Sequence, residues 1–167
     1  VRSFEPIFNG MFNALEEVYK SGGTDPDKTQ FLGTAQDLCT YYAGQADALQ
    51  RLQLSINDEI RNKVDEINTI ADQLATLNKQ INTIEITGNH ANDLRDQRNL
   101  LIDRLSKIVT VEVHETPVYT QPGGNQKSGI YNYEVSIAGG QKLVVGYDFY
   151  TLEYKARQAG EKIHQSD

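Results

Sequence analysis

The stretch IRNKVDEINTIADQLATLNKQINTI, residues 60–84, repeats apolar residues every seven positions. Two such series interleave at intervals of three or four residues, which is the a/d pattern of a helix that packs along a seam. This pattern predicts a long helix with one packing face, and it favours a role in assembly over a role in chemistry. The two series are Ile60, Ile67, Leu74 and Ile81, and Ile70, Leu77 and Ile84.

Upstream, the signals for helix ends predict two helices. Asp25 suits an N-cap and Pro26 suits the first helical turn, so the long helix is expected over about 26–85. An amphipathic helix is expected over about 5–20, because glycines directly after Ser21 favour a helix end. We expect this first helix to cover the half of the long one that precedes Ile67.

Downstream, a turn at Thr87-Gly88-Asn89 separates the long helix from a shorter one over about 91–107. A short connection makes two helices antiparallel neighbours. The apolar residues of the shorter helix should therefore pack on the 67–84 half of the long one, and they are Leu94, Leu101 and Leu105.

The beginning of the shorter helix carries the candidate contacts between helices or between subunits. They are Asn92, Asp93, Arg95, Asp96 and Arg98. One interpretation is a capped helix end held by salt bridges, since Asn and Asp satisfy the free N–H groups there. The other is a junction in which the arginines tie the turn to the neighbouring helix or to the next subunit.

After Ile108 the apolar period changes from helical to two, which is typical of strands. Val109, Val111 and Val113 should face one side of a strand that ends before a loop containing Pro117 and residues 122–125. A second strand over 131–137, a turn at Gly139-Gly140, a return strand over 142–145 and a β-prone segment over 147–154 follow.

The predicted fold class is α+β and mainly α: an elongated antiparallel helical bundle or coiled coil with a small antiparallel β-hairpin unit. The expected division is a helical rod domain over 1–107, a β unit over 108–154 at the base of an outer domain, and a truncated polar tail over 155–167.

Composition excludes several classes of function. The net charge of −7 gives no basic surface for nucleic acid, and no run approaches the ~18 apolar residues of a membrane span. His90, His114 and His164 share no metal-ligand spacing, and no phosphate-binding motif is present. We therefore expect no nucleic acid partner, no membrane insertion, no metal, no cofactor and no enzymatic activity.

Several motifs in combination resemble the flagellar hook-associated protein 1 family. They are residues 78–81, Glu85, Gly88, residues 91–98 and residues 101–109, followed by the hairpin segments 133–141 and 143–146. The resemblance implies a structural adaptor that joins hook to filament by subunit packing. It also implies that the chain is an internal fragment, without the terminal helices and most of the outer β domain of a full member.

The same resemblance implies partners and a location. The partners would be like subunits in a ring, the hook protein and the second hook-associated junction protein. The location would be the extracellular hook–filament junction, reached by type III export without a cleaved signal peptide. We expect exposed apolar residues near Phe8, Phe12 and Tyr42 to become buried only on assembly.

Three alternatives remain open at this point. One is a coiled-coil stalk whose β tip binds an extracellular glycan or protein. Another is a different axial flagellar protein, such as the second junction protein or a flagellin. The third is an enzyme whose catalytic residues lie in sequence outside this chain.

Overall fold

The computed structural model describes residues 3–119 and 127–156, and these residues form two compact units. The first unit holds the described residues 3–57, and the second is Asp58–Ala156. The helix α2 (Asp25–Glu85) contributes its first part to one unit and its remainder to the other. Each unit is described by itself below.

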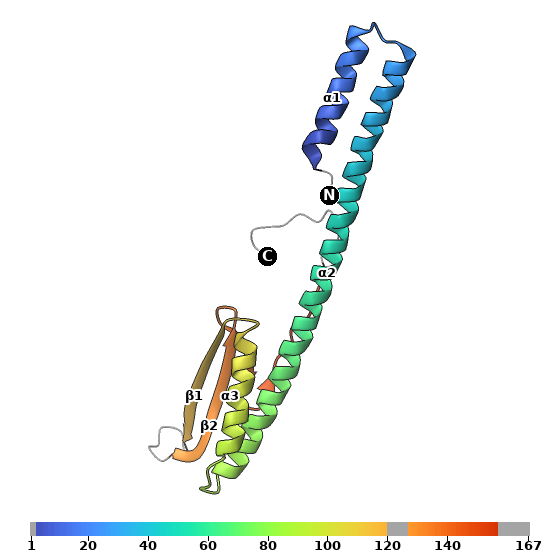
Figure 1. Cartoon of the computed structure of the whole chain (residues 1–167). Helices are drawn as coiled ribbons and strands as arrows, with labels where there is room; N and C mark the ends of the chain where they lie inside the picture. Colours follow the sequence, from blue (N-terminus) through green and yellow to red (C-terminus); the bar gives the residue numbers. More distant parts are fainter. Residues whose placement is uncertain (1–2, 120–126, 157–167) are drawn as a thin grey trace. The chain divides into compact units, whose positions relative to one another are not determined.

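In the first unit, α1 (Phe4–Lys20) lies beside the early part of α2 (Figure 1). Gly22 and Gly23 take positive φ angles of 71° and 83° in the connecting turn, where a side chain would be strained. The Phe4 ring lies 6.1 and 6.0 Å from the rings of Tyr41 and Tyr42. Farther along α2, Leu49 is 66% exposed, so α1 covers less of the helix than the sequence predicts.

The second unit combines α3 (Asn92–Ser106) and the rest of α2 with an antiparallel sheet in the order β1-β2-β3-β4. The strands are β1 (Val111–Tyr119), β2 (Lys127–Ile137), β3 (Gln141–Val145) and β4 (Asp148–Phe149). The mainly helical α+β class predicted from the sequence is confirmed.

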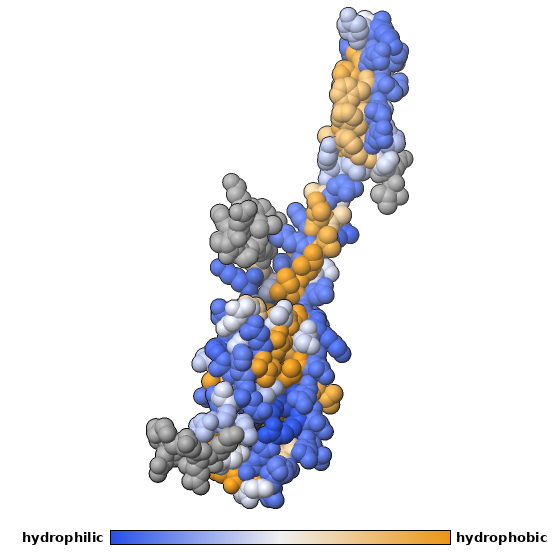
Figure 2. All heavy atoms as spheres, turned by 90° about the vertical axis from the view of Figure 1, so that its left-hand side faces the viewer, coloured by the Kyte–Doolittle hydropathy of each residue, from blue (hydrophilic) through white to orange (hydrophobic). Residues whose placement is uncertain are grey.

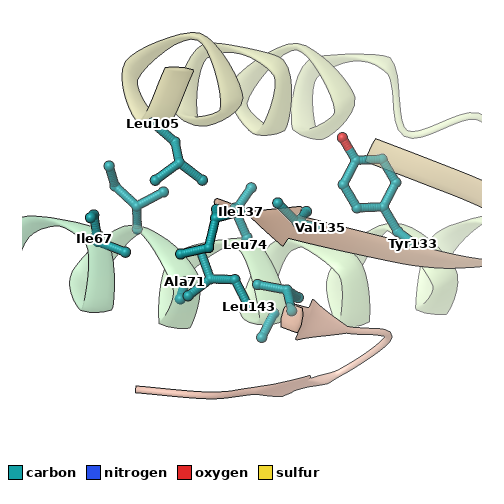
Figure 3. Packing of buried hydrophobic residues seen from close by; sticks show 11 residues of the cluster. Ile67, Ala71, Leu74, Leu105, Tyr133, Val135, Ile137 and Leu143 are labelled. Carbon is teal, nitrogen blue, oxygen red and sulfur yellow. The ribbon is translucent and has the colours of Figure 1, made fainter. Parts of the chain in front are cut away.

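The core of the second unit lies where both helices meet one face of the sheet. Figure 3 shows Leu105 from α3 and Leu74 from α2 pointing toward Val135 and Leu143 of the sheet. A sheet with one apolar face must bury that face against another layer, and here the two helices supply the layer. Residues on both sides of the predicted boundary near residue 107 therefore share one core.

Strand β1 differs from the prediction at its two ends. It begins at Val111 and continues through Pro117, which pairs with Tyr131 and was expected in a loop. Proline is tolerated here because β1 lies at the edge of the sheet, where one side needs no hydrogen bond. Val113 is 38% exposed although its face was expected to be buried.

Beyond the hairpin, strand structure in the 147–154 segment is limited to Asp148–Phe149. The turn before it needs glycine at position 146, which has φ +62° and would place a Cβ 3.0 Å from the Asn132 amide oxygen. The predicted loop at 122–125 and most of the predicted tail, residues 157–167, lie outside the described residues.

Candidate functional site

The predicted seam is buried along most of its length. Core positions on α2 and α3 are Ile67, Ile70, Leu74, Leu77, Ile81 and Leu105, while Leu94 and Leu101 are partly buried against them. Two seam residues are corrected: Ile60 is 46% exposed and Ile84 is 36% exposed. Ile60 precedes the part of α2 that the core covers.

The position of Ile84 has a different cause, which is a rotation of the buried face of α2. The sheet covers a further row of this helix, so that Ala71, Ala75, Asn78, Asn82 and Glu85 are buried too. A helix that packs against two layers buries a wider face than the a/d seam alone. Because the extra buried row lies on one side of the seam, the centre of the buried face moves to that side, and Ile84 on the other side becomes more exposed.

Arg95 ties the beginning of α3 to the end of α2. Its Nε and Nη2 atoms donate to the two carboxylate oxygens of Glu85 at 2.7 and 2.6 Å, which is a bidentate pair. Its Nη1 donates to Glu115 of β1 at 3.3 Å, and its guanidinium carbon lies 5.7 Å from the Tyr131 ring centroid. One side chain therefore connects both helices and the sheet.

Arg98 makes a second junction one turn farther along α3. Its Nη1 donates to the Asn78 side-chain oxygen and its Nη2 to Glu115, each at 3.1 Å. Its guanidinium carbon lies 3.6 Å from the centre of the Tyr133 ring, within the range of a cation–π contact. The residue is only 4% exposed, and its Nε is buried without a hydrogen-bond partner among the described residues.

The electrostatics of this junction keep it charged. Hydrogen bonds from Arg95 lower the pKa of Glu85 below its ordinary value, although burial acts in the opposite direction. The pKa of Arg95 is raised, chiefly by its hydrogen bond to Glu85. Burial raises the pKa of Tyr133. These shifts keep the Arg95–Glu85 pair charged and the Tyr133 phenol neutral near neutral pH.

The other residues of the charged motif lie outside this junction. Asn92, Asp93 and Asp96 are exposed. Ala91, not Asn92, takes the cap position of α3, and no side chain caps that end. The arginines thus connect elements of the same chain. This agrees with the interpretation that the arginines tie the turn to the neighbouring helix. Contacts with another subunit stay a prediction.

Four polar residues of this unit were not singled out for a role by sequence reasoning: Asn68, Asn78, Asn82 and Glu115. A polar residue on an amphipathic helix is ordinarily solvated, so the three asparagines gave no signal of burial. Glu115 stays exposed, but its place could have been predicted, because the period of two puts it on the same strand face as Val111 and Val113.

An exposed apolar stripe marks the first unit. Phe4, Phe8, Phe12 and Leu15 follow one side of α1, and each is at least 36% exposed. Neighbouring ring centroids are 5.1 and 4.7 Å apart, so the aromatic stripe is continuous. Figure 2 shows apolar residues gathered on one face of this unit. Patches of this kind mark interaction surfaces.

Ala14 is the one buried apolar residue among residues 3–57, so the apolar side chains of this unit are mostly left at its surface. No cluster of metal-binding side chains occurs in the described ranges. Within the same ranges, no helix has the length and apolar character needed to cross a membrane.

Together the described parts define a helical packing module with an exposed aromatic stripe. A family model described as "Flagellar hook-associated protein FlgK helical domain" matches residues 2–166. The chain belongs to this family of bacterial flagellar proteins.

Named relatives agree with that assignment. The chain is 30% identical over 119 residues to flagellar hook-associated protein 1 of Bacillus subtilis (strain 168), covering 71% of this chain and 23% of the relative. It is 31% identical over 146 residues to the protein of the same name from Salmonella typhimurium (strain LT2), covering 86% and 24%.

Among solved structures, the flagellar hook junction protein FlgK from Burkholderia pseudomallei superposes with a TM-score of 0.73 at 27% sequence identity. The match covers 90% of this chain and 24% of that one. The chain therefore spans about a quarter of the length of its relatives. The family match and the named relatives are hook-associated protein 1, or FlgK, and not the second junction protein or a flagellin.

Proposed function

We propose that this chain is part of a structural adaptor that joins the flagellar hook to the filament by packing of subunit side surfaces. The family assignment supports the flagellar setting, and the continuous aromatic stripe on α1 carries the proposal of packing. A stripe that exposes three phenylalanines is costly to leave in water, and a neighbouring subunit would cover it.

The proposed partners are like subunits in a ring, the hook protein and the second hook-associated junction protein. The proposed location is extracellular, at the hook–filament junction, after type III export without a cleaved signal peptide. Named relatives are hook-associated or hook junction proteins, which supports this setting. We propose no enzymatic activity, because adaptor function requires only matching surfaces.

The two units serve different purposes in this proposal. The second unit is internally cross-linked by the Arg95 and Arg98 junction, so that it presents fixed surfaces. The first unit offers the exposed apolar area, and we propose that the surface near Phe8, Phe12 and Tyr42 is buried only on assembly.

Deletion of the gene in the source cells tests the adaptor function. Electron microscopy should show bare hooks, with flagellin shed into the medium, and the full-length gene should restore filaments. Normal filaments on deleted cells, in a background without a second gene copy, would overturn the proposal and favour a stalk that presents a β tip to a ligand.

Accessibility labelling tests the proposed surface separately. Hydroxyl-radical oxidation of Phe8 and Phe12 should fall on going from the free protein to the assembled flagellum. Tyr150 is 56% exposed in the second unit and serves as an internal reference. Equal oxidation of the two phenylalanines in both states would show that the stripe is not an assembly surface.

A further inference from the structure

Three asparagines of α2 hold the backbone of the β segment. Asn68 donates to the Leu152 carbonyl at 3.0 Å and accepts from the Leu152 N–H at 2.8 Å. Asn82 does the same for Tyr131, at 2.8 and 3.2 Å. Because a side-chain amide both donates and accepts, each asparagine takes the place of a neighbouring strand.

Asn78 makes the third link. Its side-chain nitrogen donates to the Gly146 carbonyl at 2.8 Å, while its oxygen accepts from Arg98. The β segment runs antiparallel to α2 at these contacts. As the residue number on α2 rises from 68 to 78 to 82, the number of its partner falls from 152 to 146 to 131.

The site of the Asn82 contact explains why an amide is needed there. Strand β3 ends at Val145, which pairs with Glu134 of β2, so β2 has no strand partner on that side before Glu134. Tyr131 lies in this unpaired part, and buried backbone groups without a partner are costly. Asn82 supplies the missing donor and acceptor.

The a series alone does not fix the position of the sheet along α2. Counting Ile67 as position a, the a series is apolar at Ile60, Ile67, Leu74 and Ile81. A shift of the sheet by one heptad toward the beginning of α2, about 10 Å at 1.5 Å per residue, would keep apolar residues at position a, although Lys63 would take the place of Ile70 at position d.

The polar positions do not repeat in this way. Position b reads Asn68, Ala75, Asn82, and position e reads Ala71, Asn78, Glu85. A shift of seven residues toward the beginning of α2 would place Tyr131 beside Ala75 and Gly146 beside Ala71. A shift toward the end would place Leu152 beside Ala75, and would set the Gly146 carbonyl against Glu85, another acceptor.

The connection between α3 and β1 leaves room for such a shift. The N–H groups of Ile108 and Val109 both donate to the Leu105 carbonyl, at 2.9 and 3.0 Å, so this connection is coiled and not extended. Something other than chain length must therefore fix the register.

We propose that Asn68, Asn78 and Asn82 form a register lock, which acts together with the Arg95 and Arg98 junction to select one axial position of the sheet along α2. The lock acts by leaving part-buried backbone groups of Tyr131, Gly146 or Leu152 unpaired in a shifted position. A polar residue at one heptad position is known to specify register between helices, and here the same logic applies between a helix and a sheet.

Distance measurement between two spin labels tests the lock. Labels are attached at Asp58→Cys on α2 and Thr116→Cys on β1, both exposed, after replacing the free cysteine by Cys39→Ser. The parent chain should give one narrow distance distribution. The triple variant N68A/N78A/N82A should give a second population displaced by about 10 Å.

Two controls make the result decisive. Leu77→Ala weakens the core but leaves the three amides, so its distance distribution should stay single. If the triple variant loses its helical circular dichroism, the single variants N68A and N82A replace it, each with an added displaced population expected. A single native distance in every folded asparagine variant would overturn the register lock.

Discussion

The guanidinium carbon of Arg98 lies 3.6 Å from the centre of the Tyr133 ring, and both residues are buried. This contact joins α3 to strand β2 of the sheet. Asn78 and Glu115 bind Arg98 at the same point. The polar junction and the apolar core are therefore one structure, with the arginine enclosed on several sides.

Arg98→Ala should destabilise the second unit strongly. The variant removes the cation–π contact with Tyr133 and leaves Asn78 with an unpaired buried oxygen, which alone costs about 1–3 kcal/mol. The matched control is Arg104→Ala, which removes an exposed arginine of the same helix bound to Glu66. Exposed pairs contribute about 0–1 kcal/mol. Urea unfolding measures both, and equal losses would refute the role of the junction.

Glu85 should make stability fall in acid. Its folded-state pKa is lowered, so below the ordinary carboxyl value near 4.3 the unfolded chain binds a proton that the folded chain does not. The stabilisation is complete above that value and is lost as the pH falls through the lowered pKa. Glu85→Gln should be less stable than the parent at neutral pH, with a shallower decline in acid. Parallel pH profiles of unfolding free energy would contradict this.

Leu74→Asp should be far more damaging than Ile60→Asp, although the two residues occupy the same position of the heptad. Leu74 is fully buried beneath the sheet, so the change buries an unpaired charge, at a cost of several kcal/mol. Ile60 keeps access to water and should cost about 1 kcal/mol or less. Thermal melting followed by circular dichroism separates the two, and an unchanged melting curve for Leu74→Asp would refute the core described here.

The helices were predictable because their signals are local. Asp25 with Pro26, and the glycines after Ser21, report on backbone conformation within a turn, and they mark the ends of α1 and α2. The a/d repeat likewise predicts that Leu74 and Ile81 are buried. A repeat identifies which residues avoid water but not which element covers them.

That limit explains the errors. The pattern gave no indication that a sheet would join the helices in one core, and so it predicted a buried Ile84 and gave no sign that Asn78 and Asn82 are buried. Asn82 looks like a solvated residue until Tyr131, far away in sequence, is brought beside it. Pro117 was assigned to a loop because its tolerance in β1 depends on the strand being at an edge, which is a property of the sheet order.

The most direct test of the adaptor account is rescue of deleted cells by the full-length gene carrying Phe8→Ser and Phe12→Ser. The control is Asn13→Ser, an exposed residue on the other side of α1. Electron microscopy counts hooks that carry filaments, and the amount of exported protein in the medium confirms that each variant is made and exported. The account predicts filaments with the control and mostly bare hooks with the double variant. Equal numbers of filaments in both strains would contradict packing through this stripe.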